Sequence, residues 1–231
     1  IMKKVLLALV LSIVVTNASD FKIAAGAGYK KPIQKILKLY NKKIDAFYGN
    51  MRQVSTQAKH TDLALIIGDK NFLQNKSNID FIHYTSIGEG KAVLAYSKKT
   101  KLNTLNEILS DKIKRVSMPH PKKAIYGIAA MQILHNSKLS SNIDEKLFIT
   151  ATVPQVTTYL ITNEIDAGFI NLTSALANKS KLGGYIEIDK KLYSKIDIVA
   201  ASTKACKKEC KELLEFLQTE EAKEIFTQYG L

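Results

Sequence analysis

Short strand-like runs alternate with segments of helical periodicity along most of the chain. The run Phe21–Ala25 is followed by Ile33, Ile36, Leu37 and Tyr40, whose apolar side chains recur at the spacing of one helix face. Later runs follow the same order, and several end at a glycine or a polar turn residue. Strands that alternate with helices predict an α/β fold in which helices cover largely parallel sheets.

The pattern predicts the following elements. Strands are expected at Phe21–Ala25, Ile44–Tyr48, Asp62–Ile67, Ala92–Ser97, Arg115–Met118, Phe148–Ala151, Ala167–Ile170, Ile186–Ile188 and Ile196–Ser202. Helices are expected at Pro32–Tyr40, from Gly49–Arg52 to about Lys59, and at Leu102–Leu109, Ala124–Asn136, Val153–Ile161, Ser174–Asn178 and Lys207–Gln228.

Residues 1–18 have the composition of an export signal. Two lysines precede an apolar run, Val5–Val15, and Thr16–Ala18 ends in small residues suited to a signal peptidase. The run is shorter than the roughly 20 residues that a membrane-spanning helix needs. We therefore expect cleavage near Ser19 and a periplasmic protein; a retained N-terminal anchor is the alternative.

Composition narrows the classes of partner. With 46% hydrophobic residues the chain can build a real core, which argues against disorder. The net charge of +13 would suit an anionic ligand, an anionic membrane surface or nucleic acid. Export makes nucleic acid the weakest of these, and the lysines are scattered, without a dense basic block. We expect no nucleic-acid partner and a mostly solvated basic surface.

Two cysteines, Cys206 and Cys210, lie four positions apart. At the start of a helix this spacing brings the Cα atoms near the limit of about 6–7 Å for a disulfide, which an oxidising compartment favours. Two free thiols are the alternative. A protein-ligated metal needs more ligands, and no histidine lies nearby in the sequence, so we expect no metal site.

Glycines occur where predicted strands lead into predicted helices. Three such junctions stand out, Ala27–Lys31, Gly49–Arg52 and Lys123–Gly127. Ligands of open α/β sheets collect at the carboxyl ends of strands, and unpaired N–H groups at helix N-termini can hold an oxyanion without a metal. Each glycine taken alone also fits an ordinary turn residue.

Several ordered segments resemble one family. The closing segment Leu213–Leu231 resembles the pattern FL.S.EA..IF..YGF, and four upstream segments match in order: Thr61–Asp69, Pro119–Ala130, Glu164–Ile170 and Tyr185–Tyr193. Together they resemble the periplasmic molybdate-binding proteins, the solute receptors of molybdate ABC transporters. The resemblance covers nearly the whole chain after the export signal.

The resemblance implies a type II periplasmic binding protein fold. Two α/β lobes with mixed sheets flanked by helices are joined by two crossover hinge strands, with lobe 1 at residues 19–97 plus 195–231 and lobe 2 at residues 98–194. It further implies a tetrahedral oxyanion, molybdate or tungstate, bound between the lobes, and an inner-membrane ABC permease as partner. We expect a monomer without a cofactor.

The ligand residues carried over from the family depart from its pattern. Gly28 stands where the family has a serine, and the serine of the second loop is also missing from Asn50–Arg52. The candidate donors are the backbone amides of Gly28, Met51, Tyr126 and Val153, the side chains of Tyr29, Asn50 and Asn171, and the charges of Lys30 and Arg52. Because the hydroxyl donors differ, another anion or a small carboxylate remains an alternative ligand.

The sequence favours a binding protein over an enzyme. It has four dispersed histidines, His60, His83, His120 and His135, and no HExxH, GxSxG or cysteine–histidine pairing. We therefore expect no catalytic residues. An enzyme, an adhesin or a sensory protein built on the same scaffold remains the alternative from another functional class.

Overall fold

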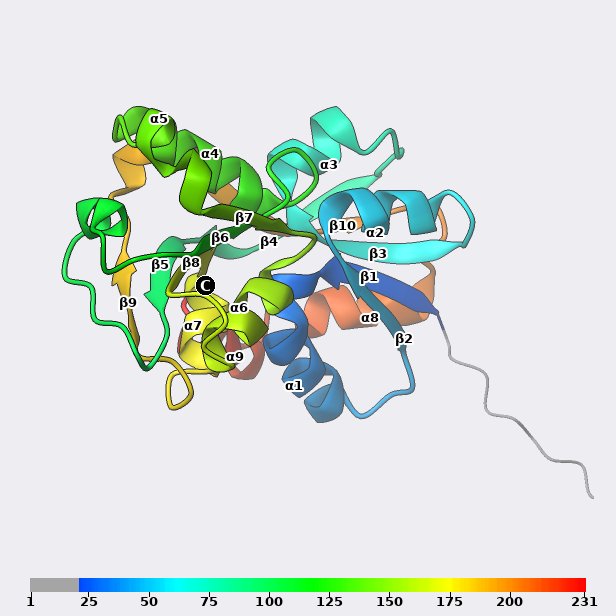
Figure 1. The fold of residues 1–231 in the computed structure, drawn as a ribbon. Helices are drawn as coiled ribbons and strands as arrows, with labels where there is room; N and C mark the ends of the chain where they lie inside the picture. The colour runs from blue at the N-terminus through cyan, green and yellow to red at the C-terminus, as the bar shows by residue number, and fades with distance from the viewer. Residues whose placement is uncertain (1–20) are drawn as a thin grey trace, which may run out of the picture.

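A computed structural model describes residues 21–231, which form two five-stranded sheets covered by helices (Figure 1). The predicted export signal lies outside this range. Within it, no helix is long and apolar enough to cross a membrane. The predicted fold class, mixed sheets flanked by helices in two lobes, is confirmed.

The first sheet has the strand order β2-β1-β3-β10-β4. Its strands are β1 (Lys22–Gly26), β2 (Asp45–Gly49), β3 (Leu63–Asp69), β4 (His83–Gly90) and β10 (Ile196–Ser202). β1 pairs in parallel with β2 and β3, whereas β10 runs antiparallel to β3 and β4. The strand β10, which comes from near the C-terminus, therefore lies between β3 and β4 in this sheet.

Helices cover both faces of the first sheet, with α2 and α3 on one side and α1 and α8 on the other (Figure 1). These elements are η1 (Ala27–Tyr29), α1 (Lys30–Tyr40), α2 (Met51–Ala58), α3 (Lys70–Lys76), α8 (Lys208–Phe216) and α9 (Glu220–Gln228). The closing helical segment predicted from Lys207 to Gln228 consists of two helices, because Thr219 caps α9 by accepting a hydrogen bond from the amide of Ala222.

The second sheet has the order β7-β6-β8-β5-β9. Its strands are β5 (Ala92–Tyr96), β6 (Val116–Pro119), β7 (Leu147–Thr150), β8 (Ala167–Asn171) and β9 (Gly184–Glu187). Its helical elements are η2 (Leu105–Leu109), α4 (Ile125–Asn136), α5 (Ser140–Ile143), η3 (Asp144–Lys146), α6 (Val153–Ile161), α7 (Leu172–Ala177) and η4 (Lys190–Leu192). β6 pairs in parallel with β7 and β8, whereas β5 runs antiparallel to β8 and β9.

The chain passes between the sheets twice, at Gly90–Ala92 and between Glu187 and Ile196. The first passage comes earlier than the expected lobe boundary at residue 97, because β5 pairs with β8 and β9. The apolar run of β5 fits a buried strand of either sheet, so its sequence does not reveal its partner. β4, the strand before the passage, was not predicted because its residues His83–Gly90 are largely polar.

A disulfide joins Cys206 to Cys210 at the start of α8, with a Cα–Cα distance of 5.2 Å. The predicted pairing is confirmed. Both cysteines are buried beneath the first sheet. Because the bridge closes a loop of only four positions, it fixes the entry to α8 more than it restricts the unfolded chain.

Gly127 allows α4 to begin close against the loop that follows β6. A Cβ atom at this position would collide with the backbone carbonyl oxygens of Pro119 and His120. Backbone atoms cannot move aside as a flexible side chain can. The glycine therefore fixes where the N-terminus of α4 lies.

We expect Gly127→Ala to lower the free energy of unfolding by about 1–2 kcal/mol. Because the colliding atoms belong to the backbone, we expect the overpacking cost in the upper part of its range, about 2–3 kcal/mol, and the better helix propensity of alanine offsets about 1 kcal/mol of it. Urea denaturation measures the difference, with Met131→Ala on the exposed face of α4 as the control. A Gly127→Ala protein as stable as the wild type would show that the close approach is not required.

Candidate functional site

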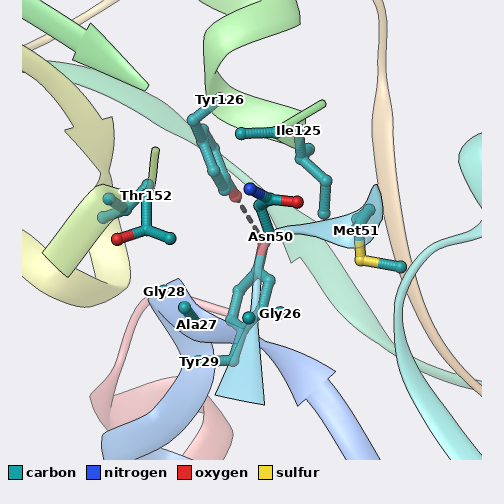
Figure 2. A pocket seen from close by; sticks show the side chains of 12 residues that line it. Gly26, Ala27, Gly28, Tyr29, Asn50, Met51, Ile125, Tyr126 and Thr152 are labelled. Carbon is teal, nitrogen blue, oxygen red and sulfur yellow. Dashed lines mark hydrogen bonds between the residues drawn. The ribbon is translucent and has the colours of Figure 1, made fainter. Parts of the chain in front are cut away.

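Four helices begin around one small cavity between the two sheets (Figure 2). The cavity is about 20 Å³, on the order of the space for one water. Its lining consists of the first residues of η1–α1, α2, α4 and α6 and the residues just before them: Gly26, Ala27, Gly28, Tyr29, Gly49, Asn50, Met51, Ala124, Ile125, Tyr126, Thr152 and Val153.

The topology brings these helix starts together. η1 follows β1 directly and α2 follows β2, while in the second sheet α4 follows β6 and α6 follows β7. Each helix thus starts beyond the carboxyl end of a strand, the usual ligand position in open α/β sheets. The first N–H groups of a helix have no partner within it and carry partial positive charge. The first residues of helices from both lobes therefore surround the cavity.

The lining residues carry no formal charge. Among the described residues that line the cavity there is no lysine, arginine, histidine, aspartate or glutamate. No carboxylate in the lining repels an anion, and no side-chain cation in the lining contributes to binding one. The electrostatic character of the site is set by helix N-termini and by two tyrosine hydroxyls.

Tyr29 and Tyr126 point at each other from opposite lobes (Figure 2). Their hydroxyl oxygens are 2.5 Å apart and form a hydrogen bond in which either can donate. The side chains are 1% and 3% exposed. Burial raises the pKa of both phenols well above the usual range, and the proximity of the two hydroxyls raises the pKa of Tyr29 further. Both tyrosines are therefore neutral donors at physiological pH.

Further hydrogen bonds join the two lobes beside the cavity. The side-chain amide of Asn50 donates to the carbonyl oxygen of Ala151 at 3.2 Å. The backbone amide of Arg52 donates to the carbonyl oxygen of Lys123 at 3.3 Å. These two contacts and the tyrosine pair all cross from one lobe to the other.

Asn171 lies at the edge of the site and explains why Gly28 is a glycine. Its side-chain nitrogen donates to the carbonyl oxygen of Gly28 at 3.1 Å, and its side-chain oxygen caps α7 by accepting from the amide of Ser174. A Cβ atom at Gly28 would lie 2.9 Å from that nitrogen. The side chain of Asn171 occupies the space that a serine at position 28 would need.

Most of the predicted ligand residues meet at the cavity. Gly28, Tyr29, Asn50, Met51, Tyr126 and Val153 line it. Asn171 does not line it, but its side chain contacts two residues that do, Gly28 and Tyr29. The side chain of Asn50 is engaged in capping α2, where it accepts from the amide of Gln53 at 2.9 Å.

The two predicted charged contributors lie outside the lining. The ammonium group of Lys30 is 5.7 Å from the ring centre of Tyr48, and both Lys30 and Arg52 are exposed. Lys30 lies on the first turn of α1 and Arg52 on the first turn of α2. Their charges act on the cavity only at a distance.

Sequence reasoning missed Thr152 at the start of α6. The signal was present, because Gln155 follows Thr152 by three positions, as in the Thr-x-x-Gln pattern of helix starts. In the structure the Gln155 side chain accepts hydrogen bonds from the amides of Ala151 and Thr152. Across residues 21–231, no group of three or more histidine, cysteine or acidic side chains is arranged to hold a metal ion.

Comparison with known proteins assigns the family. The model of the bacterial extracellular solute-binding protein family matches residues 21–231. The chain belongs to this family. The molybdate-binding protein ModA of Rhodobacter capsulatus is 27% identical over 143 residues, which cover 61% of this chain and 56% of ModA. A binding protein of Haemophilus influenzae is 23% identical over 224 residues, covering 93% of this chain and 91% of the relative.

Solved structures share the fold of this solute-binding protein. The periplasmic molybdate-binding protein of Azotobacter vinelandii matches with a TM-score of 0.81 at 18% identity, covering 91% of this chain and 98% of that one. PEB3 of Campylobacter jejuni, solved with L-phospholactate bound, matches with a TM-score of 0.73 at 17% identity and the same coverage. The resemblance to molybdate-binding proteins noted in the sequence is confirmed.

We expect this solute-binding protein to lose stability as the pH rises above 10. Tyr29 and Tyr126 are protonated in the fold at a pH where the unfolded chain, with tyrosine pKa values near 10.0, loses its protons. Their contribution is complete below pH 10 and falls above it by up to about 1.4 kcal/mol per pH unit for each tyrosine. Urea denaturation between pH 8 and pH 11 measures this slope.

The control for this alkaline loss is Tyr126→Phe, which removes one titrating phenol and keeps its ring. Its free energy of unfolding should fall less steeply with pH than that of the wild type. Identical slopes would show that the two buried phenols do not cause the alkaline loss.

Proposed function

We propose that this chain is the periplasmic receptor of an ABC importer and binds a tetrahedral oxyanion, with molybdate and tungstate preferred. The observation that carries the proposal is the convergence of four helix N-termini on one cavity whose lining has no formal charge. Helix N-termini present several N–H donors to one anion, and a hydrogen bond to a charged group contributes about 1.5–3 kcal/mol.

The size of the site favours a compact ligand. With the two tyrosine hydroxyls in contact the cavity is about 20 Å³, so even a small oxyanion enters only when the lobes part, and an extended organic molecule needs a much wider opening. A small oxyanion accepts hydrogen bonds in all directions, which matches donors that approach from two lobes. Movement about the passages at Gly90–Ala92 and between Glu187 and Ile196 would open and close the cleft around it.

The names of the relatives support the same ligand class. ModA of Rhodobacter capsulatus and the Azotobacter vinelandii protein are named for molybdate, and a further structural neighbour belongs to a tungstate ABC transporter of Geobacter sulfurreducens. PEB3 was solved with a phosphorylated carboxylate, so L-phospholactate belongs among the competing ligands. An inner-membrane permease is the partner this function requires, and we propose that the receptor acts as a monomer.

A thermal-shift and calorimetry panel tests the ligand. Molybdate and tungstate should stabilise the protein lacking residues 1–18 by about 2.7 kcal/mol at 100 times the dissociation constant. Sulfate, phosphate, L-phospholactate and small organic acids should stabilise it less at equal concentration. A shift with one of those ligands alone would overturn the oxyanion preference, and no response to any of them would favour an adhesin, a sensor or an enzyme.

A substitution at Val153 tests the contribution of one backbone amide to ligand binding. Val153 is the first residue of α6, where proline fits the helix and lacks only the N–H group, and Thr152 before it is already extended. Val153→Pro should weaken molybdate binding by about 10- to 100-fold, the loss of one hydrogen bond to a charged ligand. Calorimetry measures the dissociation constant.

Val153→Ala is the matched control, because it shortens the side chain and keeps the amide. It should change the dissociation constant much less than Val153→Pro does. Equal effects of the two variants would assign the contribution of this residue to packing and would contradict an amide contact with the ligand.

A further inference from the structure

We infer that the hydroxyls of Tyr29 and Tyr126 hold the ligand-free cleft closed by their mutual hydrogen bond. When a ligand binds, each hydroxyl exchanges that bond for a hydrogen bond to a ligand oxygen. The inference rests on the proposed function, since it concerns the same cavity. It assigns the missing hydroxyl donors of the site to one tyrosine from each lobe.

One of the two hydroxyl protons of the tyrosine pair is left without an acceptor. Two hydroxyls carry two O–H groups, and their mutual hydrogen bond uses one of them. The side-chain amide of Asn171 also interacts with the hydroxyl of Tyr29, but as a donor, so it accepts neither hydroxyl proton of the pair. A buried hydroxyl without an acceptor is costly. A ligand made only of acceptors removes that cost, because it accepts from both tyrosines at once.

The surroundings of the pair show that its position is specific. A Cβ atom on Gly90 would collide with the hydroxyl of Tyr126 and would lie 3.0 Å from the hydroxyl of Tyr29. Gly90 is paired with Ile196 in the ladder between β4 and β10, so both passages between the lobes meet here. The hydroxyls therefore lie at the floor of the cleft, next to the backbone about which the lobes would move.

The two tyrosines also belong to different lobes. Tyr29 ends η1 after β1 of the first sheet, and Tyr126 lies in the first turn of α4 above the second sheet. A bond between them can form only when the cleft is closed. A ligand that accepts from both would close the cleft in the same way, with its own oxygens between the hydroxyls.

A double-mutant cycle in molybdate binding tests the exchange. Tyr29→Phe and Tyr126→Phe each lose a ligand contact, but each also frees the remaining tyrosine from its competitor, so each should weaken binding only about fivefold. The double variant loses both ligand contacts, but the competing hydrogen bond between the two tyrosines is removed only once. It should bind about 150-fold more weakly, which is about six times more than the roughly 25-fold product of the two single effects.

Small-angle X-ray scattering of the ligand-free proteins tests the closing bond separately from any ligand. The Tyr126→Phe protein should have a larger radius of gyration than the wild type, because it lacks the bond across the cleft. Tyr48→Phe is the control in both experiments, since the hydroxyl of Tyr48 is buried without a partner and lies outside the cavity lining. It should leave the dissociation constant and the radius unchanged.

The outcomes separate this inference from the proposed function. Single effects that multiply to the double effect, or variants that bind molybdate as the wild type does, would overturn the exchange while the receptor function stands. A wild type that binds no anion would overturn the proposed function and the ligand half of the exchange together. In that case an unchanged radius in Tyr126→Phe would also overturn the closing bond.

Discussion

The structure depends on one constraint, the need to satisfy backbone N–H groups at four helix starts that lie close together. The first N–H groups of a helix have no partner inside it, and leaving them buried without an acceptor is costly. Here the starts of η1–α1, α2, α4 and α6 share one cavity between two sheets. The partial positive charge that they bring together supports the anion site that we propose, whose lining contains no lysine or arginine.

Small local features make this convergence possible. Gly127 lets α4 begin against the loop after β6, and Gly28 leaves space for the side chain of Asn171. Gly90 makes room for the tyrosine hydroxyls at the floor of the cleft. At each of these positions a Cβ atom would meet a neighbour that holds the site in place. The glycines therefore act by allowing close approach, which is more specific than the turn role that the sequence alone suggested for such residues.

Much of the fold could be predicted because strong local patterns agree with the tertiary structure. The helix Val153–Ile161 and the strand Ile196–Ser202 have the predicted bounds, since apolar periodicity and terminal residues mark both. β4 could not be predicted in this way, because its stability comes from pairing along β10 and not from an apolar run. The passage at Gly90–Ala92 was also missed, because the residues of a strand do not show which other strand it pairs with.

The sequence by itself determined the alternation of strands and helices and the family, favoured the disulfide, and named half of the residues that line the cavity. Each of these depends on local spacing or on an ordered set of motifs. Only the tertiary structure decided which groups face one another across the cleft. It directed Lys30 and Arg52 away from the lining and paired the hydroxyl of Tyr29 with that of Tyr126, 97 positions apart. The physical reason is that these contacts depend on how two separate sheets pack, and no spacing along one segment records that.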